Sequence, residues 1–298
     1  MPTSSSTSPS SAAAIQRVSF HHSAGQASSV DVARASEIRA REMDHSPYAP
    51  TRLNFHLVQF VTEGHGRHWV DFEPVALRHG DVLYVRPDQV HAFDAGARHE
   101  ARLLMFLPDA LPHADLPVSR LRLFDRVVRP DARDFRLLLP LLDHLGHLNT
   151  EAVEMQPEAV APHVLGALLA GLTSALAAQQ PPGDVTTQRY AALARAFETH
   201  LDAHLRTSRS PAWYAAALGT TPRTLARACH RTRGQAPKRL IDVRVGLEAR
   251  RLLATTADTI EAIGFGLGFS EATNFVKFFK RVVGTTPEAF RRAQGGAA

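Results

Sequence analysis

The C-terminal third of the chain contains the same sequence pattern twice, and this repeat constrains the fold more than any other feature. The first copy runs Ala217-Leu218-Gly219-Thr220-Thr221 and continues through Leu225, Cys229, Gly234 and Pro237. The second copy runs Gly266-Leu267-Gly268-Phe269-Ser270 and continues through Phe275, Phe279, Gly284 and Pro287. Leu-Gly recurs 49 residues later, and the remaining landmarks recur 50 residues later. A repeat at fixed spacing indicates one supersecondary unit that is built twice.

Each copy predicts two helices joined by a short turn that contains glycine. In the first copy, Ser210-Pro211 has the chemistry of an N-cap and a first helical residue, and Thr221-Pro222 opens the following helix. In the second copy, Thr259 begins one helix and Ser270 caps the next. Two helices joined in this way form a helix-turn-helix, whose second helix enters the major groove of DNA. The sequence therefore predicts two DNA-binding units.

The second helix of each copy has a polar face opposite an apolar face. The apolar stripe is Leu225, Ala228 and Cys229 in the first copy, and Phe275, Phe278, Phe279 and Val282 in the second. The polar face holds Arg223, Arg227 and Arg231 in the first copy, and Thr273, Asn274, Lys277, Lys280 and Arg281 in the second. Arginine and asparagine pair bidentately with guanine and adenine edges. Cys229, the single cysteine, is expected to be a small buried residue rather than a redox sensor.

The net charge is divided unequally along the chain. Residues 1–188 hold 16 arginines, no lysine and 21 acidic residues, a net charge of −5. Residues 189–298 hold 15 arginines, three lysines and eight acidic residues, a net charge of +10, so that the whole chain has the formal +5. A basic module joined to a mildly acidic one indicates a polyanion-binding domain attached to a domain with another task.

Pro237–Thr255, between the two copies, predicts one continuous helix. At ~1.5 Å per residue it spans roughly 27 Å, and successive major grooves on one face of DNA lie ~34 Å apart. A rigid helix of this length can hold two recognition helices in adjacent grooves. Basic residues on this helix and at the ends of the recognition helices are candidates for phosphate contacts. They are Arg231, Lys238, Arg239, Arg244, Arg250, Arg251, Lys280 and Arg281.

The first part of the chain predicts a β-sandwich or a β-barrel followed by helices. Residues 1–14 predict a disordered tail without signal-peptide features, and hence a cytoplasmic protein. The β-rich runs Arg52–Val61, Arg67–Phe72, Val82–Arg86 and Ala101–Leu107 are separated by turn signals such as Glu63-Gly64-His65-Gly66. Helices are expected over Asp131–Leu148 and Pro157–Gln179. The expected domains are residues 15–130, a helical connection over 131–180, a linker over 181–188, and residues 189–298.

The leucine stripe of the second of these helices has two interpretations. It pairs with the same helix of a second chain to form a homodimer, or it packs on its own barrel. No window of 18 apolar residues occurs, so no membrane span is expected.

At these positions the sequence resembles the AraC/XylS family of bacterial transcription regulators. The resemblance covers about Arg189–Arg292 and is carried by Thr221-Pro222-Arg223-Thr224-Leu225, Ala249-Arg250-Arg251-Leu252-Leu253 and Phe279-Lys280-Arg281, among other landmarks. It implies base-reading positions at Arg223, Ala226 and Arg227, and at Ala272, Thr273, Asn274 and Lys277. The two alanines offer only apolar contacts. Gly264 departs from the alanine usual in its helix, which is expected to loosen the second unit.

The resemblance also implies a cupin-like sensor domain in the first part of the chain. Glu63, His68, Trp69, His91 and Phe93 are the candidate effector-binding residues at the mouth of its pocket. Cupin enzymes bind a metal through an HxH pair, a later Glu and a further His. Here His68, Glu73 and His91 follow that order, but Gly66 replaces the first histidine, so no metal and no other cofactor are expected. His65, His68, His79 and His99 are expected to lie on the surface as loop or strand-end polar residues.

These observations predict a multidomain protein of α and β structure, with an N-terminal cupin-like barrel and a C-terminal double helix-turn-helix domain. The predicted function is a sequence-specific transcription regulator, an activator by resemblance rather than an enzyme, that binds promoter DNA, RNA polymerase and a small-molecule effector. A metal-dependent cupin enzyme with a DNA-binding domain is one alternative. A ligand-independent regulator controlled by a protein partner is another.

Overall fold

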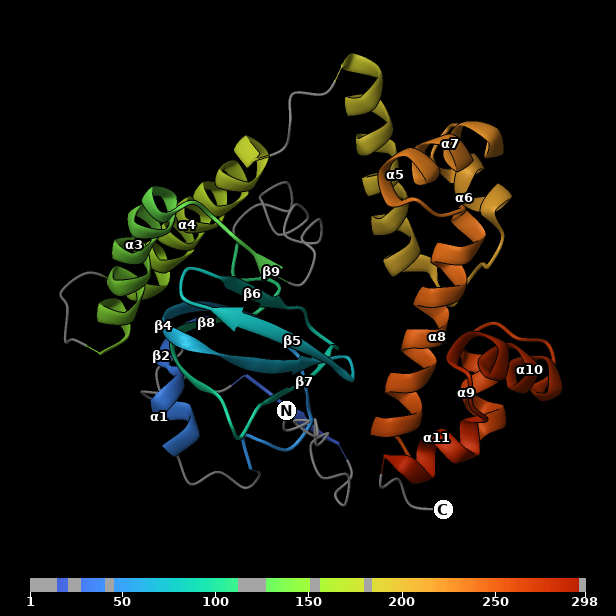
Figure 1. The fold of residues 1–298 in the computed structure, drawn as a ribbon, viewed down its shortest axis with the longest axis horizontal. Coiled ribbons are helices and arrows are strands. Elements are labelled where there is room, and N and C mark those ends of the chain that lie inside the picture. The colour runs from blue at the N-terminus through green and yellow to red at the C-terminus, as the bar shows by residue number, and fades with distance from the viewer. Residues whose placement is uncertain are drawn as a thin grey trace, which may run out of the picture. The chain divides into compact units, whose positions relative to one another are not determined.

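The computed structural model describes residues 15–20, 28–40, 46–111, 127–150, 156–179 and 184–294. The predicted tail at residues 1–14 lies outside them. The chain divides into two compact units, which part between Gln180 and Pro181. The first unit consists of a sheet and helices, and the second is helical (Figure 1). The predicted fold class, a barrel-like domain followed by a double helix-turn-helix domain, is confirmed.

The described part of the first unit contains a sheet of nine strands. The strands are β1 (Gln16–Val18), β2 (Val30–Arg34), β3 (Thr51–Leu53), β4 (His56–Val70), β5 (Glu73–Arg78), β6 (Val82–Val85), β7 (Val90–Phe93), β8 (Arg98–Phe106) and β9 (Val127–Val128). Helix α1 (Ala35–Ala40) follows β2 directly. The path β1-β3-β7-β4-β6-β9 orders most of the sheet, while β8 joins β2 to β4 and β5 pairs with β4.

Strand β4 is the centre of this arrangement. Its first part pairs with β6 and β8, and its last part pairs with β5 and β7. A 15-residue strand therefore belongs to both walls of the barrel-like sheet. A register shift between Val61 and Glu63 lets it bend there.

The turn expected at Glu63-Gly64-His65-Gly66 is wrong, because these residues lie inside β4. The glycines serve close backbone approach instead of a turn. Gly64 has φ +71°, and a β-carbon there would collide with the carbonyl oxygen of Arg98 on β8. The chain actually reverses at Asp71 and Phe72, whose φ values of 51° and 69° are the positive values that a two-residue type I′ hairpin turn requires. Asp71 is a residue type that tolerates positive φ, whereas Phe72 is not a typical signal for that turn.

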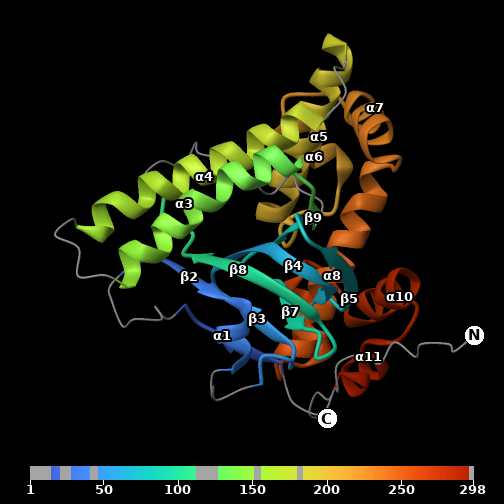
Figure 2. The ribbon, with the colours of Figure 1, turned by 60° about the vertical axis from the view of Figure 1, so that its left-hand side comes forward.

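Two apolar cores cover the two faces of the sheet, because alternate side chains of a strand point to opposite sides. Val58 and Phe60 belong to the core beneath helices α3 (Ala132–Thr150) and α4 (Pro157–Gln179). Leu57 and Val61 belong to the second core, on the other face. Figure 2 shows α3 and α4 lying side by side over the sheet.

The apolar stripe of α4 packs inside its own unit. Leu165, Leu168, Leu169 and Leu172 are fully buried in the core that α4 shares with α3 and the sheet. Among the described helices, α4 is the one whose length and hydropathy would also suit a membrane span. The burial of its leucine stripe in the core that it shares with α3 and the sheet is the arrangement of a core helix.

The second unit consists of seven helices within the described residues. They are α5 (Val185–His204), α6 (Pro211–Ala217), α7 (Pro222–Arg233), α8 (Pro237–Thr255), α9 (Ile260–Gly266), α10 (Ala272–Val283) and α11 (Pro287–Ala293). Figure 1 shows α8 running from the group α5–α7 to the group α9–α11. Asp184 caps α5 by accepting a hydrogen bond from the Thr187 amide, so residues 185–188, expected as linker, are already helical.

Candidate nucleic-acid interface and effector site

The first helix-turn-helix consists of α6 and α7. Ser210 caps α6 and accepts a hydrogen bond from the Trp213 amide, and Thr221 caps α7 and accepts one from the Thr224 amide. Proline occupies the first position of each helix, where no intrahelical N–H bond is lost. Between the helices, Gly219 adopts φ +60°, a left-handed conformation that glycine takes without strain. The predicted starts of α6 and α7 are confirmed.

The second helix-turn-helix, formed by α9 and α10, repeats this plan with one difference. Thr259 caps α9 through the Ala262 amide, and Gly268 takes the turn with φ +78°. Ser270, expected to cap α10, does not do so. The N-cap residue is Glu271, and no side-chain hydrogen bond caps the helix.

Both recognition helices bury one face and expose the other. In α7, Leu225, Ala228 and Cys229 are fully buried. In α10, Phe275, Phe278 and Phe279 are buried, and Phe269 from the preceding turn packs its ring against two of them. The side chains expected to meet DNA lie on the exposed faces. These are Arg223, Arg227 and Arg231 on α7, and Thr273, Asn274, Lys277, Lys280 and Arg281 on α10.

The residues expected to contact phosphate are in different environments. Arg239 is exposed, and Arg231 lies with its guanidinium 5.6 Å from the ring centroid of Tyr190. Lys238 and Arg281 both pair with the buried carboxylate of Asp242, at 2.7 Å and 3.2 Å, which offsets part of their charge. Arg244 pairs with Asp202 of α5.

The prediction that Arg251 contacts a phosphate is wrong. Its side chain is 2% exposed and lies 3.4 Å from Glu248, so it is a core residue of α8 and has no access to a phosphate. Glu248 also pairs with Arg206, at 3.3 Å. A buried carboxylate needs a charged partner, and this explains an arginine in the interior.

The expected effector residues do not form one group. His68 on β4 and His91 on β7 stack with a ring separation of 5.2 Å, and Phe93 contacts both rings. Trp69 follows His68 in the strand and therefore points to the opposite face. Glu63 is exposed and lies across from Glu100 in the register of β8. The structure brings together His68, His91 and Phe93 and leaves the other two residues apart.

Sequence reasoning missed Gln59 and misassigned His99. His99 is 2% exposed, and its Nε2 lies 2.7 Å from Nε2 of the buried Gln59. His68 is fully buried as well, so neither histidine is a surface residue as expected. The signal for Gln59 was available, because it is a polar residue at an inward position of an otherwise apolar strand.

Gly66 explains why the metal-binding HxH pattern is broken. A β-carbon at Gly66 would lie 2.6 Å from Nδ1 of His99, so the glycine makes room for this imidazole. Glu73 is exposed on β5, whereas His68 and His91 are buried. Within the described residues, no group of three or more His, Cys, Asp or Glu side chains is arranged to hold a metal ion.

The buried histidines are held neutral. Burial lowers the pKa of His68 well below its usual value, and the neighbouring His91 and His99 lower it further. Burial also lowers the pKa of His99, and Arg39 adds to the effect, against opposing contributions from Glu100 and Asp94. A neutral imidazole can donate one hydrogen bond and accept another. The site therefore offers polar recognition without charge on these histidines.

Several buried polar atoms around these histidines have no hydrogen-bond partner in the described structure. They are Nδ1 of His68, Nδ1 of His99, Oε1 of Gln59 and Nη1 of Arg39. Arg39 reaches the same place from α1, where its Nη2 donates to the carbonyl oxygen of His99 at 3.2 Å. A buried polar atom that lacks a partner costs about 1–3 kcal/mol. Groups that supply these partners would therefore bind favourably.

Two family models match the chain. A helix-turn-helix domain family matches residues 214–293, and the family described as the AraC-like ligand binding domain matches residues 36–111. None of the curated proteins matches the chain.

Solved structures similar to this chain include an AraC-type regulator from Chromobacterium violaceum. It is 22% identical, covers 36% of this chain and 96% of its own, and has a TM-score of 0.33. A 1.65 Å structure of ToxT from Vibrio cholerae is 10% identical, covers 89% of this chain and 97% of its own, and has a TM-score of 0.38. Wild-type ToxT bound to an unsaturated fatty acid is 11% identical, with 82% and 89% covered and a TM-score of 0.37.

Proposed function

Because this chain belongs to the AraC family of DNA-binding transcriptional regulators and carries that family's N-terminal ligand-binding domain, we propose that it reads promoter DNA with both helix-turn-helix units at once. The observation that carries this proposal is the pair of exposed polar faces, one on α7 and one on α10, each opposite a fully packed apolar stripe. Arg223 and Arg227 read bases in one groove, and Thr273, Asn274 and Lys277 read bases in the next.

In this proposal, phosphate contacts position the two recognition helices, α7 and α10, on the DNA. The exposed candidates are Arg231, Lys238, Arg239, Lys280 and Arg281, and the half-buried Arg244 contributes to the same field. Lys238, Arg244 and Arg281 each have an acidic partner as well. Helix α8 has 19 residues, and the steps between them, at ~1.5 Å each, span about 27 Å. That length favours major grooves about one helical turn apart.

Selection from random double-stranded DNA with the full-length chain tests this proposal. We expect one operator with two half-sites whose centres are separated by about 10 base pairs. Affinity for it should fall steeply as salt rises, because phosphate neutralisation releases counterions. Enrichment of a single half-site, or a flat salt response, would overturn it.

We also propose that the effector is a small molecule with hydroxyl groups that binds among Arg39, Gln59, His68 and His99. The unpartnered atoms there include a certain donor, Arg39 Nη1, and a certain acceptor, Gln59 Oε1. A hydroxyl group donates and accepts, so one ligand group can serve both kinds of atom. His91 and Phe93 would form the wall beside His68.

Thermal unfolding of the full-length chain against a panel of sugars, polyols and hydroxy acids tests the effector site. A ligand at 100 times its Kd should stabilise the first unit by ~2.7 kcal/mol. We expect Gln59→Leu to abolish the shift and the exposed control Glu63→Gln to retain it. A stabilising ligand whose effect survives Gln59→Leu and His99→Phe would place the site elsewhere.

In this proposal the regulator is a cytoplasmic homodimer that recruits RNA polymerase, and the effector shifts the equilibrium between DNA-binding arrangements. Sedimentation with and without operator DNA tests the dimer. In vitro transcription from the selected operator, with and without effector, tests activation.

A further inference from the structure

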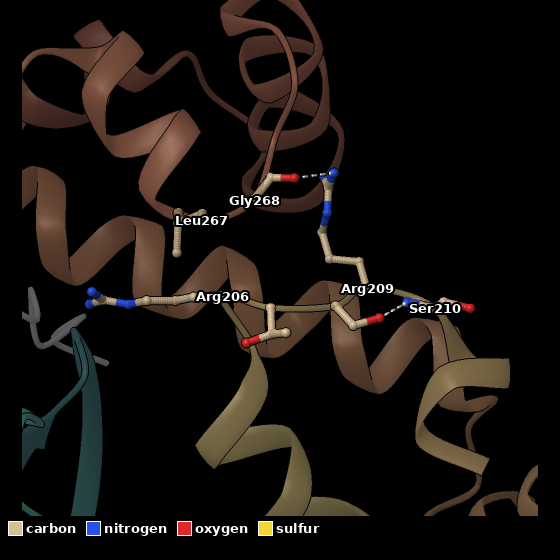
Figure 3. Close-up of a pocket in the computed structure, with 7 residues that line it drawn as sticks. Arg206, Arg209, Ser210, Leu267 and Gly268 are labelled. Atoms are coloured by element: carbon tan, nitrogen blue, oxygen red, sulfur yellow. Dashed lines mark hydrogen bonds between the residues drawn. The ribbon is translucent and has the colours of Figure 1, made fainter. Parts of the chain in front are cut away.

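Arg209 lies in the loop that joins α5 to α6 and reaches into the second helix-turn-helix unit. Its Nη2 donates a hydrogen bond of 2.9 Å to the carbonyl oxygen of Gly268, in the turn between α9 and α10. Its guanidinium carbon lies 3.6 Å from the centroid of the Phe269 ring. Figure 3 shows the side chain pointing across to Gly268, while the Arg206 side chain extends away from it.

The loop that carries Arg209 is fixed to the first helix-turn-helix on both sides. The Tyr214 hydroxyl of α6 donates to the carbonyl oxygen of Ser208 at 2.9 Å. Ser210 caps α6, which packs against the recognition helix α7. Tyr214 is itself fully buried, with its ring against Phe197 of α5. Arg209 therefore projects from a rigid part of the first helix-turn-helix.

The receiving turn is fixed to the second recognition helix. The Phe269 ring is buried and packs against Phe275 and Phe278 of α10, with centroids 5.3 Å and 5.0 Å apart. Gly268 passes so close to the loop that a β-carbon there would lie 2.9 Å from the carbonyl oxygen of Arg206. A cavity of about 280 Å³ remains beside this contact, lined by residues 206–210, Leu267 and Gly268.

Arg209 is partly removed from solvent at this contact. Burial lowers the pKa of its guanidinium, and the nearby carboxylate of Asp242 opposes that effect. Removal from water strengthens both the cation–π contact and the hydrogen bond. A planar guanidinium can do both at once, whereas a lysine ammonium cannot.

We propose that Arg209 is a positioning residue that sets the separation of the two recognition helices and thereby the spacing between the half-sites that the protein accepts. Helix α8 joins the two helix-turn-helices at one place, and the Arg209 contact joins them at a second. Neither helix-turn-helix can therefore pivot about α8. This inference rests on the proposed binding of two grooves. It assigns Arg209 no contact with DNA.

The proposal makes a distinct prediction about operators of altered spacing. Two linked readers bind as one bivalent ligand, and a rigid link gives a high effective concentration only at the matching span. For the full-length wild type, insertion or deletion of one base pair between the half-sites should weaken binding by about 10-fold or more. For Arg209→Ala, binding to the original operator should fall by about 10-fold, and the added penalty for altered spacing should drop below about 3-fold.

Three further variants separate positioning from other roles. Arg209→Lys keeps the charge but loses the planar stack, so it should resemble Arg209→Ala. Phe269→Leu removes the stacking ring and should relax spacing in the same way. Arg206→Ala is the matched control on the same cavity, since the Arg206 side chain is 59% exposed and its ion pair is expected to contribute little. It should keep the spacing profile of the wild type.

Each outcome decides the matter. A wild type that shows no spacing dependence overturns the two-groove function itself. A spacing-dependent wild type together with unchanged profiles in Arg209→Ala and Arg209→Lys overturns the positioning role alone. If Arg209→Lys binds like the wild type while Arg209→Ala weakens all operators and single half-sites equally, Arg209 is a phosphate contact. Phe269→Leu supplies the same readout if Arg209→Ala unfolds, and an unrelaxed profile in it counts against the proposal.

Discussion

The two helix-turn-helix units share one backbone plan but differ in how their helices pack. Ala215 of α6 is fully buried, and the residue 49 positions later is Gly264 of α9. Leu225 of α7 corresponds in the same way to Phe275 of α10, 50 positions later. A β-carbon at Gly264 would lie 3.0–3.2 Å from three carbons of Phe275. Where the first helix-turn-helix has Ala215 and Leu225, the second has the smaller Gly264 and the larger Phe275.

The expectation that Gly264 loosens the second helix-turn-helix is therefore wrong. The Phe275 ring packs over the glycine, and the space saved on α9 is filled by α10. Cys229 and Phe279 show a similar difference, since both are fully buried at equivalent positions. The lesson is that the repeat preserves the turn glycines and the caps, while the total volume of each core is partitioned differently.

The reading faces differ more than the cores, and they should show the largest effects. Arg227→Ala and Asn274→Ala should each weaken binding to the selected operator by about 1–3 kcal/mol, with little effect on random DNA. Arg227→Ala should also reduce the salt slope, whereas Asn274→Ala should leave it unchanged because asparagine is uncharged. Binding titrations over a range of salt, with each operator base pair varied, measure both.

Lys280→Ala is the control for these two variants. As a phosphate contact it should weaken all sequences uniformly and lower the salt slope by about one. If Arg227→Ala and Asn274→Ala both bind the operator like the wild type, the reading faces are wrongly assigned.

The exchanged core pair predicts that opposite substitutions are both destabilising. Ala215→Gly should lower the free energy of unfolding by about 1–2 kcal/mol, because helix propensity and a buried methyl group are lost. Gly264→Ala gains propensity, but crowding against Phe275 costs about 1–3 kcal/mol, so we expect a net loss. Denaturant unfolding measures both. A Gly264→Ala protein more stable than the wild type by about 1 kcal/mol would show that close packing does not require the glycine.

The unequal caps predict a smaller difference. Thr221→Ala should cost about 1 kcal/mol, because it leaves the Thr224 amide without its partner. Ser270→Ala should change stability by less than about 0.5 kcal/mol, since Ser270 does not cap α10. Urea unfolding compares the two, and equal losses would contradict the observed N-cap at Glu271.

The smallest effect concerns the thiol at the Cys229 position. Burial raises its pKa to about 11, and Glu198 raises it as well. Because the pKa is higher in the folded than in the unfolded state, the unfolded chain loses this proton first, and stability declines as the pH rises above the unfolded value of about 9. At pH 8, iodoacetamide should modify native Cys229 only as fast as the chain opens. Rapid modification of the native protein would contradict this.

The repeat allowed most of the second unit to be predicted, because caps, turn glycines and helical periodicity are local signals. Pro237–Thr255 has the predicted bounds of α8. The first unit was harder, because the same residue type has different uses there. Gly64 and Gly66 resembled a turn, but they allow close approach of β8 and of the His99 ring.

The amino-acid sequence by itself determined that there are two helix-turn-helix units, which faces of their second helices are polar, and which half of the chain is basic. These properties depend on neighbours in sequence and on periodicity. Only the tertiary structure decided that Arg251 is a core residue beside Glu248, that Gln59 meets His99, and that Arg209 joins the two units through Gly268 and Phe269. Each of these contacts depends on where the chain returns in space, so the role of a polar or charged residue is set by the partner it meets there.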